Sequence, residues 1–281
     1  MPLSARFVFR MIFQFLLAAM AGGRALAVTP GVVLVAHRAV YELSLLSSRG
    51  LNGIGEARGR LVFEITGSAC EGYATNFRQV IQVSGAEGSS DRSFDVRSAS
   101  FEAGDGTMLR FTNDTVRGNQ TDHVEGKARA TAKGVEITVT KPEPSSLTAP
   151  PDTLFPNAHI KRLVLEATAG NKLFSTKVFD GSDTGHKVYD TFAVLGAPVS
   201  AAAAAHAEPA AMAEQLKGHV SWPVTLSYFE QGPGERLPSY KMSFVLYDNG
   251  VSRALTLDYG EFALKGELKS IDFLKSTACD K

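Results

Sequence analysis

The fold class is decided by a short stretch near the beginning of the chain, Ala39-Val40-Tyr41-Glu42-Leu43-Ser44-Leu45. Apart from Ala39-Val40, apolar and polar side chains alternate along this stretch. Successive side chains of a β-strand point to opposite faces of a sheet. The alternation therefore predicts a strand with one buried and one solvated face, which is the pattern of an antiparallel sheet.

Similar runs continue from this stretch towards the C-terminus. They are short and are bounded at fairly even spacing by Gly, Asn, Asp and Ser, which indicates a meander or a barrel. About fourteen strands are more than one flat sheet usually carries, so we expect a mainly β fold, a curled or spiral barrel with one packed helix. Besides residues 39–45, the expected strands are 59–65, 73–83, 93–96, 98–101, 108–115, 122–130, 135–139, 172–179, 187–195, 224–229, 240–247, 251–259 and 261–273.

A proline-rich segment, residues 142–156, interrupts these runs. Proline cannot donate a ladder hydrogen bond, so the segment cannot be a central strand, and we expect an extended connection over the surface. Immediately after it, Asn157 can cap a helix that runs to about Glu166 and ends near Gly170.

A second interruption is the alanine-rich segment Ala201–Ala213. Its five consecutive alanines favour helix. However, Pro209 interrupts the segment, and no apolar stripe is present that would dock it. We expect a mobile loop with partial helix.

Composition excludes several classes of protein. The 281 residues include 29 Lys and Arg against 29 Asp and Glu, with 44% hydrophobic and 21% charged residues. This is an ordinary globular mixture rather than that of a disordered, acidic or collagen-like protein. The balanced charge gives no basic footprint for nucleic acid.

The N-terminus predicts a secretory signal peptide. Arg6 and Arg10 precede a mostly apolar run over residues 11–21, and Ala25-Leu26-Ala27 follows as a cleavage site of small residues. The alternative is a membrane anchor, but the run is shorter than the roughly 20 residues that span a bilayer. We expect cleavage after Ala27, a single domain over residues 28–281 and no transmembrane segment in the mature chain.

The chain has two cysteines, Cys70 and Cys279. In the oxidising compartment that export implies, a lone pair of cysteines indicates a disulfide. Two free thiols or a catalytic cysteine are the alternatives, but neither residue lies in a C-x-x-C pair or a Cys-His signature. We favour a structural disulfide that fastens the C-terminus to the body of the domain.

Motifs that would carry catalysis or bind a cofactor are mostly missing. The glycines of residues 53–59 nearly imitate a dinucleotide loop, but the spacing is one residue too long and a strand follows. We expect them to permit a strand bend. The histidines show no metal-ligand spacing, and no Gly-x-Ser-x-Gly elbow is present. We expect no catalytic, cofactor-binding or metal-binding residues.

One polar loop between two predicted strands looks like the start of a calcium site. A calcium loop needs a bidentate Glu at its twelfth position, which here is Thr191. Weak calcium binding is the alternative, but Asp-Gly turn chemistry explains the residues better. We expect a structural turn that aligns the two strands, formed by Asp180, Gly181, Ser182, Asp183, Thr184 and Gly185.

Six stretches, taken together and in order, carry a resemblance to a known family. In chain order they are Ala36-His37-Arg38-Ala39-Val40-Tyr41-Glu42-Leu43, Gly59-Arg60-Leu61-Val62-Phe63-Glu64, Cys70-Glu71-Gly72-Tyr73, Phe155-Pro156-Asn157-Ala158-His159, Phe179-Asp180-Gly181-Ser182-Asp183-Thr184-Gly185 and Cys279. This series resembles the EipB family of periplasmic envelope-integrity proteins from diderm bacteria.

The resemblance implies a β-spiral, an open rolled barrel of about fourteen strands with a helix, closed by the pair Cys70 and Cys279. It also implies a periplasmic location, a role in cell-envelope homeostasis, no established enzyme activity and a tetratricopeptide-repeat protein as partner.

We therefore hypothesise a non-enzymatic periplasmic protein that maintains the cell envelope by binding. The runner-up is a carrier or chaperone for a lipid or lipoprotein segment, held in a groove of the curled sheet. A more distant alternative is an enzyme that acts on an envelope polymer. A sheet of about fourteen strands is wider than the roughly eight-stranded barrel that side chains can fill. Two alternatives are therefore equally open, an apolar cavity and an interior plugged by the helix and the N-terminal segment.

Overall fold

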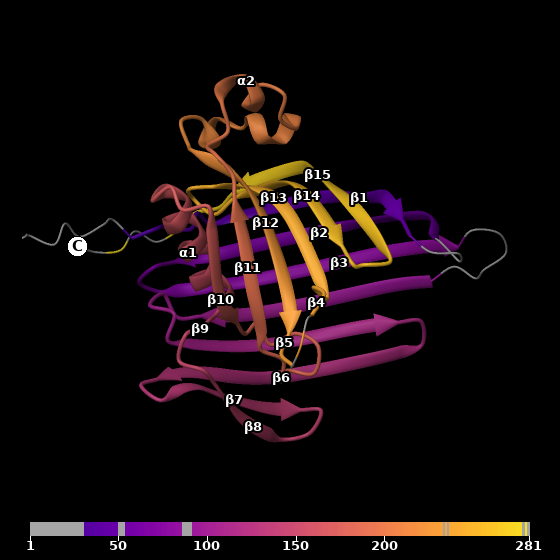
Figure 1. Cartoon of the computed structure of the whole chain (residues 1–281), viewed down its shortest axis with the longest axis vertical. Coiled ribbons are helices and arrows are strands. Elements are labelled where there is room, and N and C mark those ends of the chain that lie inside the picture. Colours follow the sequence, from indigo (N-terminus) through magenta and orange to yellow (C-terminus); the bar gives the residue numbers. More distant parts are fainter. Residues whose placement is uncertain are drawn as a thin grey trace, which may run out of the picture. The chain divides into compact units, whose positions relative to one another are not determined.

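The computed structural model describes residues 31–49, 54–85, 92–232, 234, 236–276 and 279. The predicted signal peptide and its cleavage after Ala27 lie outside these residues. Within them, fifteen strands form one nearly closed, barrel-like sheet with a single seam (Figure 1). The expected fold class, mainly β with few helices, is confirmed.

The strands pair in an order that follows the sequence closely. β1 lies in the middle of the sheet, with β2 on one side and β15 on the other. The end strands are β8 and β9, and β9 pairs with β10 in parallel whereas the other pairs of described strands are antiparallel. The strands are β1 (His37–Ser48), β2 (Ile54–Ser68), β3 (Gly72–Gly85), β4 (Arg92–Glu102), β5 (Met108–Arg117), β6 (Gln120–Thr131), β7 (Gly134–Lys141), β8 (Ser145–Ala149), β9 (Thr153–Leu154), β10 (Leu173–Val178), β11 (Tyr189–Leu195), β12 (Ser221–Glu230), β13 (Tyr240–Tyr247), β14 (Ser252–Asp258) and β15 (Phe262–Phe273).

Alternation along the strands produces two main clusters of buried side chains. The larger cluster joins inward residues of β1–β3 with those of β11–β15, across the interior of the sheet. The smaller cluster joins β5–β8 with Phe155, Phe179 and Val188, which come from segments flanking β9–β11. In Figure 1, β2–β6 cross behind β11–β14, which is how residues far apart in sequence meet in one core.

The proline-rich segment is more than a surface connection. It contains β8, which pairs with β7, and the two-residue β9. The sequence predicted an extended connection over the surface and did not predict that parts of it pair as strands. Pairing is possible because the prolines lie outside both strands and because an end strand leaves one side unpaired. The segment forms no central strand, as its prolines require.

The alanine-rich segment is docked, contrary to expectation. It contains the short helix α2 (Ala201–Ala204) and two 3-10 turns, η1 (Pro209–Met212) and η2 (Glu214–Leu216). Ala207, Ala210 and Ala211 pack against the larger cluster. The buried Arg253 guanidinium lies 3.2 Å from the Glu208 carboxylate, which also accepts the Ala254 N–H at 2.8 Å. Small side chains let the backbone approach the core closely, so the segment docks without a wide apolar stripe.

Helix α1 (Pro156–Thr168) begins one residue earlier than expected, and Asn157 does not cap it. Proline fits the first helical position because a backbone N–H there would have no acceptor within the helix, so nothing is lost when proline lacks this group. The capping acceptor comes from Glu102, at the end of β4. Its carboxylate accepts the N–H groups of Asn157 and Ala158, both at 2.8 Å. Burial raises the pKa of Glu102 to about 7.

Glu102→Gln should destabilise the protein. The amide can offer one acceptor oxygen, but its NH₂ then faces a backbone N–H, so we expect a loss of about 1–3 kcal/mol in the free energy of unfolding. The raised pKa means that the folded protein keeps a proton that the unfolded chain loses near its ordinary value of 4.5. The stability contributed by this group therefore falls as pH rises from about 4.5 to 7. Urea unfolding should show a larger loss at pH 5 than at pH 8, and an equal loss at both would contradict the assignment.

Candidate functional site

Four tyrosines form a row on the inward face of four consecutive strands. Tyr189 begins β11, Tyr228 lies near the end of β12, Tyr240 begins β13 and Tyr259 follows β14. Neighbouring ring centroids lie 5.9, 5.9 and 5.2 Å apart along the row. Phe262 extends it at 5.1 Å from Tyr259. We call these four residues the tyrosine row.

Solvent reaches the tyrosine row although it faces the interior. All four residues are half-buried, and so are Phe77 on β3 and Phe94 on β4, which pack against the same cluster. The register pairs Tyr228 with Tyr240 at one end of β12 and β13, and Trp222 with Leu246 at the other. Trp222 and Leu246 are buried, so the interior is filled at their end, whereas the tyrosines at the other end are partly exposed to solvent.

Helix α1 contributes to the filled part of the interior. Leu163, Val164 and Ala167 are buried in the larger cluster, and Ile160 packs against it. The apolar face of the helix is therefore the face that docks. The helix therefore fills part of the interior, which is the second of the two alternatives that the sequence left open.

The polar groups of the tyrosine row are neutral hydroxyls. Burial raises the pKa values of Tyr228, Tyr240 and Tyr259. Gln79, on β3, donates from Nε2 to the Tyr259 hydroxyl at 2.9 Å and so joins the two faces of the interior. Neutral rings and hydroxyls supply apolar contact and hydrogen bonds, which suits binding rather than acid–base catalysis.

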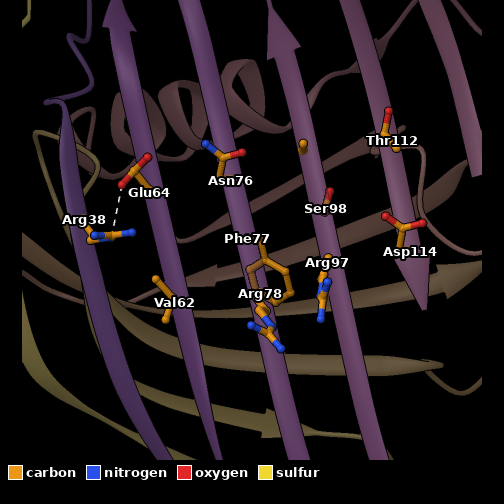
Figure 2. A pocket seen from close by; sticks show the side chains of 11 residues that line it. Arg38, Val62, Glu64, Asn76, Phe77, Arg78, Arg97, Ser98, Thr112 and Asp114 are labelled. Carbon is orange, nitrogen blue, oxygen red and sulfur yellow. Dashed lines mark ion pairs between the residues drawn. The ribbon is translucent and has the colours of Figure 1, made fainter. Parts of the chain in front are cut away.

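A separate hollow of about 480 Å³ lies on the outward face of β1–β5 (Figure 2). Its charges pair within the protein. Arg38 binds Glu64 at 3.2 Å, and Arg78 and Arg97 each approach Asp95 to 2.9 Å. These hydrogen bonds lower the pKa of Asp95 to about 2. The hollow is a solvated, salt-bridged surface.

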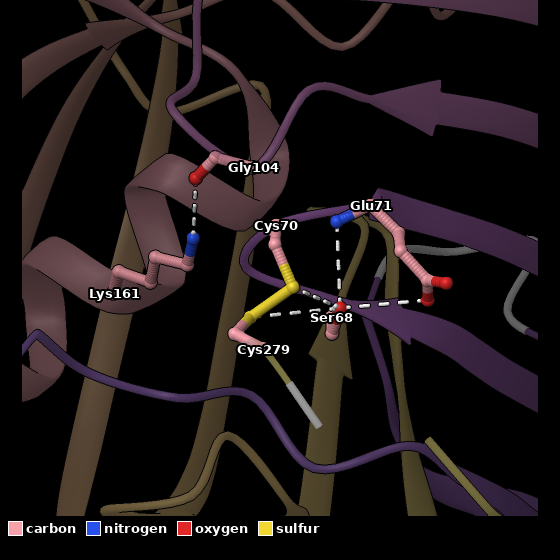
Figure 3. The surroundings of a disulfide bond; sticks show 6 residues. All are labelled: Ser68, Cys70, Glu71, Gly104, Lys161 and Cys279. Carbon is pink, nitrogen blue, oxygen red and sulfur yellow. Dashed lines mark hydrogen bonds between the residues drawn. A yellow bond between two sulfur atoms is a disulfide. The ribbon is translucent and has the colours of Figure 1, made fainter. Parts of the chain in front are cut away.

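Cys70 and Cys279 are joined by a disulfide, with their Cα atoms 5.7 Å apart (Figure 3). Cys70 lies in the turn between β2 and β3, and Cys279 follows β15. Ser68 Oγ lies 3.2 Å from the Cys70 sulfur and accepts the Glu71 N–H at 3.4 Å. The bond ties the end of the chain to the first half of the sheet.

The segment 180–185 adopts a turn that is packed into the smaller cluster. Ser182 N–H donates to Asp180 Oδ1 at 2.9 Å, and Gly185 N–H donates to the Ser182 carbonyl at 2.9 Å. The Gly181 carbonyl accepts from Asn113 Nδ2, on β5, at 2.6 Å. Asp183 is paired with Lys187 at 2.5 Å. The turn joins β10 and β11 and also contacts the first half of the sheet.

The glycine-rich segment 53–59 enters strand β2, whose described part begins at Ile54. A register shift lies between Ile54 and Glu56, as a strand bend requires. At Gly59 a Cβ atom would lie 2.2 Å from the Val80 carbonyl oxygen, so a side chain there would clash with the neighbouring strand.

No group of three or more His, Cys, Asp or Glu side chains in the described part of the chain is arranged to hold a metal ion. None of the helices built from the described residues has the length and apolar character needed to cross a membrane.

The tyrosine row is the feature that the sequence did not reveal. Its members are spread from residue 189 to residue 259, and only the register of β11–β14 brings them together. Each lies at the end of a strand on an inward position. Tyrosine at the same end of successive predicted strands is the signal that identifies such a row.

Comparisons with known proteins agree with this architecture. A family model described as EipB-like matches residues 29–275. The chain is 37% identical over 275 residues to the cell envelope integrity protein EipB of Brucella abortus (strain 2308), with 95% of each chain covered. A crystal structure described as a beta-barrel-like protein of the domain of unknown function DUF1849, from Brucella abortus, matches with a TM-score of 0.78 and 34% identity. The match covers 86% of this chain and 99% of that one.

Proposed function

Because the chain belongs to the EipB-like family, we propose that it is a periplasmic, non-enzymatic protein that maintains cell-envelope integrity by binding, with the tyrosine row as its binding surface. The proposal includes a signal peptide over residues 1–27 and one domain over residues 28–281. The name of the Brucella relative supports the envelope role.

A single observation carries the choice of surface. The tyrosine row faces the interior but is only half-buried, so solvent reaches it. At the opposite ends of the same strands the inward side chains, such as Trp222 and Leu246, are buried. Aromatic side chains that stay accessible inside a curled sheet offer a large apolar contact area with a few polar handles, which is the usual composition of a ligand site. The outward hollow lacks this character because its charges are satisfied by one another.

A second candidate function follows from the same surface. A carrier or chaperone for a lipid or lipoprotein segment needs an apolar surface reached from one end. Phe77, Phe94 and Met242 provide apolar area packed with the tyrosine row against the larger cluster. A tetratricopeptide-repeat partner stays a prediction from the family resemblance.

The binding surface can be tested with an uncharged fluorescent probe, N-phenyl-1-naphthylamine. The mature protein should bind it saturably without losing its near-ultraviolet circular dichroism, and an acyl chain should displace it. Tyr240→Ser should weaken binding about tenfold by removing aromatic contact area. The matched control Phe192→Ser removes an aromatic ring, 37% exposed, outside both buried clusters and should leave the affinity unchanged.

The same variants test the cellular role. In a strain that lacks the chromosomal copy, wild-type protein and Phe192→Ser should restore resistance to detergent, and Tyr240→Ser should not. Absence of probe binding by the folded protein, or binding only after partial unfolding, would refute the tyrosine row as the binding surface. Full complementation by a folded, probe-deficient Tyr240→Ser would separate the envelope role from this surface.

A further inference from the structure

We propose that one edge of β10 binds an extended segment of a partner protein. The segment adds to the sheet as a further strand beside Leu173–Thr176 and directs uncharged side chains into a hollow next to α1. The residues of this surface are not those of the tyrosine row, so the proposal does not depend on that row.

The first half of β10 has no neighbouring strand on one side. On its other side, β11 pairs with all six residues of β10, from Leu173 to Val178. β9 pairs only with Lys177 and Val178. Among the described strands, none therefore covers Leu173–Thr176 on the side of β9. We call these four residues the open edge, and Figure 1 shows β10 at the side of the sheet, beside α1.

The backbone groups of Leu173 and Ser175 point out of the open edge. On the β9 side, the Phe179 N–H donates to the Leu154 carbonyl at 3.0 Å, and on the β11 side the Lys172 carbonyl accepts an N–H from the end of β11 at 2.8 Å. Backbone groups alternate between the two edges along a strand. The N–H and C=O groups of Leu173 and Ser175 therefore point away from β11, where no described backbone group binds them. Free donors and acceptors at this spacing match the backbone of another strand.

The open edge lacks the features that usually protect a sheet edge, which are proline, charged side chains, bulges and covering segments. The strand at the other end of the sheet, β8, is flanked by Pro144 and Pro150. The open edge contains neither proline nor a charged residue, and its register with β11 is regular. Leu173 is 61% exposed. An accessible edge without these features favours a strand kept free for a partner.

A second hollow of about 480 Å³ lies beside the open edge. It is lined by residues 174–176 of β10, by one side of α1 and by the turn 104–106. Leu154 and Leu165 contribute apolar surface to it, together with the Phe174 ring. A strand added at the open edge would place every second side chain towards α1, so the hollow gives these side chains room.

The charged groups that line this hollow are already bound within the protein. They are Lys161 Nζ with the Gly104 carbonyl at 3.0 Å, Arg162 with Glu166 at 2.6 Å, Asp105 with the Thr107 N–H at 3.0 Å and Asp152 with Lys177 at 3.6 Å. A charged side chain of the partner would have to compete with these contacts, whereas an uncharged one would not. The hollow therefore favours uncharged side chains on the added strand.

The test measures binding of a synthetic peptide to the mature protein by fluorescence anisotropy. The probe is acetyl-Lys-Thr-Val-Thr-Val-Thr-Val-Lys-amide with fluorescein on the last lysine, because threonine and valine favour an extended strand. We expect saturable binding, and NMR should show that the amide protons of Leu173 and Ser175 become protected from exchange with deuterium.

Two further peptides are matched controls. One carries N-methyl groups on the six central amides, so it keeps the side chains but has no N–H to pair, and its Kd should be at least about tenfold higher. The other has lysine in place of each threonine and glutamate in place of each valine, so that charges face the hollow in either orientation of the strand. Its Kd should also be at least about tenfold higher.

Ser175→Pro should raise the Kd of the threonine–valine peptide at least about tenfold. Proline removes the N–H that points out of the open edge and leaves the hydrogen bonds between β10 and β11 in place. The matched control Ser175→Ala keeps this N–H and should bind the peptide like the wild-type protein. Near-ultraviolet circular dichroism checks that both variants are folded. If Ser175→Pro does not fold, the N-methylated peptide gives the same test on the wild-type protein.

The results that would overturn the proposal are distinct. Absence of peptide binding by the wild-type protein, or equal binding of the N-methylated peptide, would refute the open edge as a strand-binding site. Equal binding of the charged peptide would refute the preference for uncharged side chains. Self-association that occurs without peptide and is lost in Ser175→Pro, measured by analytical ultracentrifugation, would show that a second copy occupies the edge instead of a partner segment.

Discussion

Replacing Gly181 by valine should lower the free energy of unfolding by about 2–5 kcal/mol. Gly181 has φ of +72°, a region that β-branched residues avoid. A Cβ atom there would lie 2.4 Å from the Phe111 ring. Phe111 is itself fixed edge to face against Phe179, with ring centroids 5.5 Å apart. The variant therefore suffers both backbone strain and overpacking of the smaller cluster.

Two controls make this prediction specific. Gly218→Val has nearly the same backbone strain, with φ of +81°, but a Cβ atom there meets nothing within 4 Å. It should cost about 1–2 kcal/mol, the conformational part alone. Asp183→Asn removes a half-exposed partner of Lys187, which keeps Glu230 at 2.7 Å, and should change stability by less than about 1 kcal/mol. Equal losses for Gly181→Val and Gly218→Val in urea unfolding would show that the contact with Phe111 does not matter.

Calcium provides a further check on the same turn. Because Asp183 is bound to Lys187 and Asp180 accepts the Ser182 N–H, neither carboxylate is free to serve as a calcium ligand without breaking the turn. Micromolar calcium should leave the melting temperature unchanged. An increase would show that the segment is a calcium site after all.

Cys279→Ser should lower the free energy of unfolding by about 2–4 kcal/mol, the range measured for most disulfides. Cys70 and Cys279 are 209 residues apart in sequence, so the bond closes a very long loop in the unfolded chain. Loop-closure entropy alone gives about 5 kcal/mol, an upper figure because the unfolded chain keeps residual structure. For a protein of this size, each kcal/mol corresponds to about 2–4 °C in melting temperature.

Reductant provides the matched control for the disulfide. Dithiothreitol should lower the melting temperature of the wild-type protein to that of the variant and should leave the double variant Cys70→Ser/Cys279→Ser unaffected. Thiol that can be titrated in unreduced, denatured mature protein would refute the pairing.

The local features of the fold were predictable because they depend on neighbouring residues. β13 has the predicted bounds, Tyr240–Tyr247, since alternation is clear and the turn at Asn249-Gly250 ends it sharply. β4 was expected as two short runs, but Arg97 merely occupies the solvated face and the strand continues through it. A charged residue on an outward position is no break, yet the sequence alone does not say which face is outward.

Features that depend on register were not predictable. The cap of α1 comes from Glu102, 55 residues before Asn157, and could not be found by searching the residues near the helix. The tyrosine row depends on four strands pairing in one register. The docking of the alanine-rich segment depends on the buried contact of Glu208 with Arg253, 45 residues later. In each case the deciding contact joins segments that no local pattern connects.

The position of β15 has a consequence for how the molecule is made. Residues 262–273 are synthesised after the other described strands, yet they occupy the middle of the sheet, between β1 and β14. Before they are made, β1–β8 and β10–β14 can each form an antiparallel meander from neighbouring strands, but the strand that connects the two meanders is missing. Pairing the first strand with the last is a long-range contact, which slows folding.

Until that step, β1 and β14 present unpaired edges, and such edges invite aggregation. A chain that stops before Phe262 keeps both edges open permanently and also lacks the cysteine that closes the disulfide. Products that end before Phe262 should therefore aggregate, because β15 is the strand that joins the two halves into one sheet.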